Sequence, residues 1–186
     1  GWSFPFPHRQ MVTAPLKESF PNLRDEILAG VRQSHLFDVL TADEVAHLVD
    51  SAKLCTFAPG EAAVRQGDAG SSLFFVLRGE MSVEVNGNEV ARLGQGRMFG
   101  EMSLLTGEPR KATVRACTEV ILAELSKSAI AELMDSNDKL LERLGEALSR
   151  HTASNQQQQE QQVESDAGER SPVDYLKRLR DFFGKG

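Results

Sequence analysis

The chain has 186 residues and a mass of 20.5 kDa, which is enough for one domain of ordinary size with flanking segments. Its 27 acidic and 21 basic residues give a formal net charge of −6, which argues against binding nucleic acid through bulk positive charge. The longest apolar run, residues 73–77, has the length of a β-strand and is far shorter than the ~20 residues of a membrane span. The chain begins Gly1-Trp2, with no initiator Met and no signal-peptide pattern, so we expect it to be a piece of a longer protein.

The cysteines and histidines predict neither a disulfide nor a metal site. Cys55 and Cys117 are isolated and lie within apolar stretches, so we interpret both as small core residues of a protein in a reducing compartment. His35 and His47 fall in one region but lack the spacing of metal ligands. No nucleophile–base pair or hydrolase motif is visible either, so we expect no catalytic residues and no enzyme activity.

The N-terminal part predicts an extended segment followed by helices. Residues 1–20 contain three prolines and are interpreted as extended chain that ends a preceding domain. Asn22 can cap a helix whose apolar residues recur at helical spacing. Residues 41–44, Thr-Ala-Asp-Glu, have the form of a capping box, which predicts a second helix.

Between residues 53 and 126 the apolar period changes from 3.6 to 2, which indicates β-strands. Residues 80–85 alternate between polar and apolar side chains, which predicts one wet and one buried face. Asn86-Gly87 is a favoured two-residue hairpin turn. Further strands are expected at Lys111–Ala116 and Val120–Leu125. Short strands separated by glycines predict an all-β barrel or roll here.

The C-terminal part predicts two helices, a linker and a third helix. Helical spacing returns at residue 127, and a longer stripe begins near Ser136, the candidate cap of a helix at about 137–152. The Gln-rich residues 152–170 are expected to form a flexible linker. Residues 171–186 begin with Ser-Pro and are expected to form a basic amphipathic helix. It would lie at a membrane surface or on a partner, or else serve as a plain packing helix or dock on a sister subunit.

Residues 99–114 carry the candidate binding chemistry, with the sequence Phe-Gly-Glu-Met-Ser-Leu-Leu-Thr-Gly-Glu-Pro-Arg-Lys-Ala-Thr-Val. Gly100 allows the backbone to approach a ligand closely, and a short helix from Glu101 to Leu105 would turn its amides toward an anion. Arg110 offers a planar fork that suits two phosphate oxygens. Because Glu101 would repel a phosphate, we expect it to accept hydrogen bonds from sugar hydroxyls instead. These residues together predict a ligand with one phosphate charge, a ribose and a base.

Residues 99–116 resemble the phosphate-binding cassette of the cyclic nucleotide-binding domain family, in which F-G-E-hydrophobic-A/S-L-L leads to P-R-x-A-T/S-V. The resemblance implies that Glu101 binds the ribose 2′-hydroxyl, with the backbone of Gly100 and Met102 nearby. It implies that Arg110 binds the cyclic phosphate, with help from the backbone of Lys111 and Ala112. Members selective for cyclic GMP usually have Thr after the Arg, so Lys111 favours cyclic AMP, with cyclic GMP possible.

The same resemblance, which covers about residues 35–150, implies a fold and a mechanism. The expected fold class is α+β: an antiparallel, jelly-roll-like β-roll flanked by N-terminal helices and a C-terminal lid helix, together spanning residues 21–151. The lid helix would swing over the base, where Leu148, Arg150 or His151 could contact it. A ligand that prefers the closed lid shifts the population toward it.

Residues 2–9, Trp-Ser-Phe-Pro-Phe-Pro-His-Arg, resemble the closing strand of the cytoplasmic domain of small-conductance mechanosensitive channels. This predicts a cyclic-nucleotide-binding regulatory module of a bacterial membrane channel, on the cytoplasmic side of the inner membrane and in a homo-oligomer. A structural alternative is a proline-rich linker. The functional alternative is a soluble regulatory subunit, or a transcription regulator that lacks its DNA-binding domain, since no helix-turn-helix pattern follows the long helix.

Overall fold

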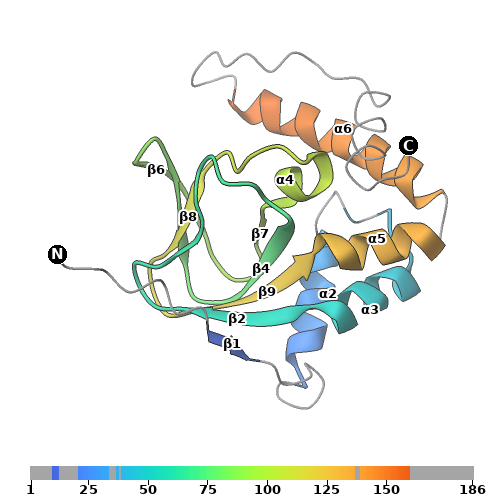
Figure 1. Cartoon of the computed structure of the whole chain (residues 1–186), viewed down its shortest axis with the longest axis horizontal. Helices are drawn as coiled ribbons and strands as arrows, with labels where there is room; N and C mark the ends of the chain where they lie inside the picture. The colour runs from blue at the N-terminus through green and yellow to red at the C-terminus, as the bar shows by residue number, and fades with distance from the viewer. Residues whose placement is uncertain (1–9, 13–20, 34–36, 38, 137–138, 160–186) are drawn as a thin grey trace.

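The computed structural model describes residues 10–12, 21–33, 37, 39–136 and 139–159. Two antiparallel sheets form a roll, and most of the helices gather against one of them (Figure 1). The five-stranded sheet has the order β1-β2-β9-β4-β7 and the four-stranded sheet the order β3-β8-β5-β6. The strands are β1 (Gln10–Val12), β2 (Lys53–Phe57), β3 (Ala62–Val64), β4 (Ser72–Arg78), β5 (Met81–Val85), β6 (Asn88–Leu93), β7 (Met98–Phe99), β8 (Thr113–Ala116) and β9 (Val120–Ser126). The helices are α2 (Leu23–Gln33), α3 (Ala42–Ser51), α4 (Glu101–Thr106), α5 (Lys127–Ser136) and α6 (Leu140–Gln159). The predicted α+β fold with an antiparallel roll is confirmed.

Strand β4 separates the two hydrophobic clusters of the protein. Leu73, Phe75 and Leu77 point to the helices, where they join the cluster formed with α2, α3, α5 and α6. Phe74 and Val76 point into the roll and join the second cluster. Because both faces of β4 are covered, its sequence is a continuous apolar run and shows no alternation.

The hairpin β5–β6 follows the prediction at its turn but not along β5. Asn86 and Gly87 both have positive φ, 53° and 82°, as a two-residue turn of this type requires. The expected alternation in β5 is wrong, since Ser82 is buried while Val83 and Val85 are only partly buried. Ser82 is buried among its hydrogen-bond partners on one face, and Val83 borders a cavity on the other.

The helix starts are confirmed on the N-terminal side. The carbonyl of Asn22 accepts a hydrogen bond from the Glu26 amide, so α2 begins where the cap was expected. Thr41 and Glu44 form the predicted capping box, in which the Glu44 amide donates to Thr41 Oγ1 at 3.3 Å. The Thr41 amide donates to Glu44 Oε2 at 2.7 Å.

Several predicted boundaries are corrected by the structure. Ser136 is the last residue of α5 and does not cap the next helix, which begins at Leu140. Helix α6 continues to Gln159, so residues 152–159 are helical and not linker; Gln is a good helix former, and extending an existing helix is far easier than nucleating one. Strand β8 begins at Thr113, which leaves Lys111 and Ala112 in the preceding loop.

Residues 10–12 form β1 and pair with β2, so this part of the N-terminal segment belongs to the sheet of the roll. The predictions for residues 1–9, 13–20 and 160–186, including the channel-like motif, most of the linker and the terminal helix, lie outside the described residues.

Other predictions concern side-chain burial and membrane crossing. Neither Cys55 nor Cys117 forms a disulfide; Cys55 is fully buried as expected, whereas Cys117 is partly exposed. Within the described ranges, no helix has the length and apolar character needed to cross a membrane. No group of three or more metal-ligating side chains gathers among the same residues.

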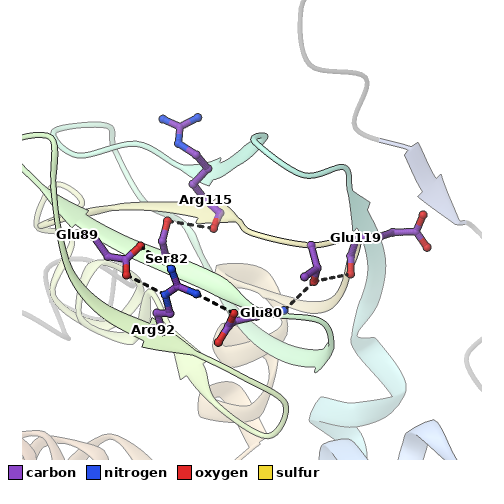
Figure 2. A network of polar contacts seen from close by, with 7 residues as sticks. Glu80, Ser82, Glu89, Arg92, Arg115 and Glu119 are labelled. Atoms are coloured by element: carbon purple, nitrogen blue, oxygen red, sulfur yellow. Dashed lines mark hydrogen bonds and ion pairs between the residues drawn. The ribbon is translucent and has the colours of Figure 1, made fainter.

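The outer face of the four-stranded sheet carries a network of exposed charges (Figure 2). Arg92 pairs with Glu89 at 2.8 Å and with Glu80 at 3.1 Å, and Ser82 Oγ donates to the carbonyl of Arg115. Exposed ion pairs of this kind contribute little to stability. Their effect is to keep this face polar while the opposite face lines the interior of the roll.

The roll is packed at one end and hollow at the other, and two valines test this difference. Val76 is 1% exposed and packed in the roll cluster, whereas Val83 borders the cavity. We expect Val76→Ala to lower the free energy of unfolding by about 2–3 kcal/mol, and Val83→Ala by less than about 1 kcal/mol, since its loss only enlarges an existing cavity. Urea denaturation of both variants measures the difference. Equal losses would mean that the interior is uniformly packed.

Candidate functional site

A cavity of about 570 Å³ opens in the roll between the inner face of the four-stranded sheet and helix α4. Its volume falls in the range of pockets that hold one small ligand. The six predicted binding residues all border it: Gly100, Glu101, Met102, Arg110, Lys111 and Ala112. The remaining lining is mostly apolar and comes from Val64, Val83, Ala91, Leu93, Met98, Phe99, Ser103 and Val114. The cavity therefore has a charged end and an apolar end.

Helix α4 is positioned at the charged end by Gly100. Gly100 precedes the helix with φ of 87°, a conformation that strains any other residue, and its carbonyl accepts the first helical hydrogen bond from Leu104. The helix is one residue longer than expected and ends at Thr106, whose hydroxyl donates to the Met102 carbonyl. The predicted short helix is confirmed.

Arg110 is buried and is already bonded to the protein. Its Nη1 donates to the Gly100 carbonyl at 3.0 Å, and its Nη2 donates to the Ser72 carbonyl at 2.7 Å. The guanidinium also lies over the ring of Phe74, 5.9 Å from the centroid, and the residue is only 7% exposed. Two carbonyls and one ring thus fix the fork that the sequence analysis expected to face a phosphate.

Burial has the largest effect on the ionisation of Arg110. Burial lowers the pKa of Arg110, while the carboxylates of Glu101 and Glu124 act in the opposite direction. Arginine nonetheless stays protonated at neutral pH. The site therefore holds a desolvated positive charge, which is an arrangement suited to an anion.

The backbone of Arg110 is held by the loop before β4. The Arg110 amide donates to the Asp68 carbonyl and the Gly67 amide donates to the Arg110 carbonyl, both at 2.8 Å. Gly70, in the same loop, lies so close to the guanidinium that any side chain there would overlap it. Only glycine leaves room for the arginine at this position.

The other two charged residues lie differently. Glu101 is partly buried at the start of α4 and borders the cavity. Lys111 stands on the rim with its side chain 65% exposed, and its Nζ lies 3.6 Å from Glu108 Oε2. The chemistry of a carboxylate and a guanidinium on one cavity allows two different polar groups of one ligand to be bound at once.

Helix α6 was predicted to lie over the ligand as a lid. Among the residues whose side chains are described, none from α6 borders it, and Arg150 is exposed. The side chains of Leu148 and His151 lie outside the described set. The predicted contact of α6 with a ligand therefore remains a prediction.

Helix α4 connects the cavity to the helical core. Glu101, Met102 and Ser103 border the cavity, while Leu104 and Leu105 are fully buried in the cluster that also contains Leu140, Leu141 and Leu144 of α6. Helices α4 and α6 thus contribute side chains to the same hydrophobic cluster.

Sequence reasoning missed the residues that hold Arg110. Phe74 was seen only as part of an apolar run, Gly70 only as one of the glycines between short strands, and Ser72 was not singled out. Gly70 was the single signal that the sequence offered. Ser72 lies 38 residues from Arg110, and both Ser72 and Gly100 bind the guanidinium through backbone carbonyls, which every residue has.

Comparison with known proteins gives the family. Residues 54–137 match the family model described as cyclic nucleotide-binding domain. Over 108 residues, 58% of its length, the chain is 33% identical to a cGMP-dependent protein kinase of Plasmodium berghei (strain Anka), and it covers 13% of that protein.

Two solved structures share the fold. The N-terminal domain of a transcriptional regulator from Streptomyces coelicolor A3(2) has a TM-score of 0.61 and 26% identity, with 74% of this chain and 99% of that chain covered. A cyclic nucleotide-binding domain from Methylobacillus flagellatus KT has a TM-score of 0.64 and 25% identity, with 86% and 92% covered. Residues 54–137 therefore form a domain of the cyclic nucleotide-binding family, and the chain shares the fold of a solved member.

Proposed function

We propose that the cavity binds cyclic AMP, with the cyclic phosphate on Arg110 and the ribose 2′-hydroxyl on Glu101. The observation that carries this proposal is the meeting of these two side chains, which are nine positions apart in sequence, on one cavity of about 570 Å³. A monoanionic phosphate would compensate the desolvated guanidinium, and a hydroxyl would donate to the carboxylate. The apolar end would take the base.

Arg110 can receive a ligand without leaving its place. The two hydrogen bonds to Gly100 and Ser72 use two of its five N–H groups, so the others can turn to phosphate oxygens while the carbonyls keep the fork oriented. A preoriented fork loses little side-chain freedom on binding. This supports Arg110 as the phosphate-binding residue.

The preference for cyclic AMP rests on Lys111. Its side chain points to solvent beside Glu108 and has no hydroxyl to offer a guanine. The relative from Plasmodium berghei is named for cyclic GMP, which supports cyclic nucleotides as the ligand class. Cyclic GMP is therefore the comparison ligand in the binding experiments.

We further propose that the domain regulates a bacterial mechanosensitive-type channel and that α6 transmits the ligand signal. Residues 2–9 support the channel context through their resemblance to the end of a channel domain. The route of the signal is supported by the hydrophobic cluster to which both α4 and α6 contribute, since a ligand that displaces α4 would act on that cluster. The module would then act on the cytoplasmic side of the inner membrane within a homo-oligomer.

A second candidate is the ligand-sensing part of a transcription regulator. The likeness to the Streptomyces coelicolor domain, 99% of which is covered, favours it. The two candidates differ in the partner domain, which would be a membrane channel in the first and a DNA-binding domain in the second.

Replacing Arg110 tests the phosphate assignment. We expect Arg110→Ala to lose about 2–5 kcal/mol of cyclic AMP affinity, because the desolvated charge pair is lost. Calorimetric titration with cyclic AMP and cyclic GMP measures it, with circular dichroism to check folding. Arg78→Ala, which removes an exposed arginine at the end of β4, is the matched control and should bind normally. Unchanged affinity in folded Arg110→Ala would refute the assignment.

Glu101 is tested with a sugar variant of the ligand. In the wild type, 2′-deoxy cyclic AMP should bind about 1.5–3 kcal/mol more weakly than cyclic AMP, the contribution of a hydrogen bond to a charged group. In Glu101→Ala the two ligands should bind alike, so the double-mutant cycle isolates one contact. If removal of the 2′-hydroxyl weakens binding as much in Glu101→Ala as in the wild type, another residue binds that hydroxyl.

The channel proposal is tested on the protein encoded by the complete gene. Patch-clamp recording from membranes that contain it should show a current that changes when cyclic AMP reaches the cytoplasmic face. The response should disappear in Arg110→Ala and when residues 140–186 are deleted, with the current itself retained. A gene product without membrane spans, or a response that survives the deletion, would contradict the channel context or the role of α6, respectively.

A further inference from the structure

A second carboxylate, Glu124, lies on the other side of Arg110 from the ligand cavity. It belongs to β9, in register with Phe74 on β4, and is partly buried. Its Oε1 accepts a hydrogen bond from Ser72 Oγ at 2.6 Å, and its Oε2 accepts one from Cys55 Sγ at 3.5 Å. These two donors, one of them on a fully buried residue, keep the carboxylate in place.

Glu124 and Arg110 border a small polar cavity of about 200 Å³. Arg110 borders both cavities, whereas Glu124 borders the small polar cavity and not the ligand cavity. Ser72 links Arg110 to Glu124, because its carbonyl accepts a hydrogen bond from Arg110 Nη2 while its hydroxyl donates one to Glu124. Glu124 thus acts on a bound phosphate through its charge and not through contact.

The charges around the phosphate position are already weighted toward the negative side. Two carboxylates, Glu101 and Glu124, act on the single guanidinium of Arg110. The other charges nearby oppose each other, with Lys111 beside Glu108 on the rim and Arg65 with Asp68 on the polar cavity. Lys53, opposite Glu124 on β2, is exposed to solvent, which screens its charge.

One negative charge on a ligand suits this arrangement and a second does not. A cyclic phosphodiester carries one charge, which Arg110 compensates. An open phosphomonoester carries close to two charges above pH 7, and the second meets two carboxylates in a partly desolvated setting. We infer that Glu124 sets the charge preference of the site, so that it accepts a cyclic monoanionic phosphodiester and rejects the dianionic open monoester that hydrolysis of the same nucleotide produces. This inference rests on the proposed binding of a cyclic nucleotide at Arg110.

The experiment compares dissociation constants of the full chain for cyclic AMP and 5′-AMP at pH 8, by calorimetric titration. Glu124→Gln removes the charge and keeps an oxygen that can accept from Ser72. We expect the ratio of the 5′-AMP to the cyclic AMP dissociation constant to fall at least about fivefold in this variant. The matched control is Glu119→Gln, which removes an exposed charge five residues before Glu124 in the sequence. Figure 2 shows that the Glu119 side chain points away from the charge network. Its ratio should stay within twofold of the wild type, since the charge is screened.

An unchanged ratio in Glu124→Gln, or an equal fall in Glu119→Gln, overturns the inference. If Glu124→Gln does not fold, we measure instead the dissociation constant of the wild-type protein for the methyl ester of 5′-AMP, an open phosphodiester that carries one charge. If the methyl ester binds clearly more tightly than 5′-AMP, the inference is supported. If it binds as weakly as 5′-AMP, the inference is overturned, because the site then recognises ring closure and not charge. A wild type that binds no cyclic AMP overturns the proposed function, and the role of Glu124 with it.

Discussion

The structure depends on a buried guanidinium held by backbone carbonyls. Arg110 is fixed through its main chain by Gly67 and Asp68 and through its side chain by the carbonyls of Gly100 and Ser72. A desolvated charge is costly unless it is bonded and compensated, so every one of these contacts must be made for the site to exist. They tie together three segments: the loop before β4, the first residue of β4 and the entry to α4. The ligand cavity lies where these segments meet.

The hollow end of the roll follows from the same constraint. A β-roll of this size can fill its interior with side chains, and it does so around Phe57, Val76, Met81 and Leu122. Near Arg110 a cavity remains between the four-stranded sheet and α4. The helical cluster on the other face of the five-stranded sheet supplies apolar packing that the cavity lacks. Binding and stability are thus divided between the two faces of β4.

Helix α4 makes the two faces interdependent. Its six residues are too few for an independently stable helix, so its position is set by what it contacts on either side. One side is the cavity and the other is the cluster that α6 shares. Helix α6 is tied in turn to the start of α3, where Arg143 lies 3.6 Å from the capping residue Glu44. The cavity lining, the helical cluster and the start of α3 therefore share the elements α4 and α6.

Local sequence determined the features that depend on neighbouring residues. The Thr41–Glu44 capping box, the Asn86-Gly87 turn and the short helix after Gly100 were predictable, because each is made by residues within one turn of chain. The spacing of Glu101 and Arg110 identified the candidate site for the same reason. Boundaries such as the end of α6 were wrong where polar composition was taken to mean disorder.

Only the tertiary structure decided what surrounds Arg110. Ser72, Gly70, Phe74 and Glu124 come from distant segments, and two of the contacts use carbonyl or ring groups that carry no local signature. The partial exposure of Val83 likewise reflects the cavity that it borders and not its strand position. Sequence specifies which groups are available, but burial and long-range pairing specify which of them share one environment, and the energy of a charge depends on that environment.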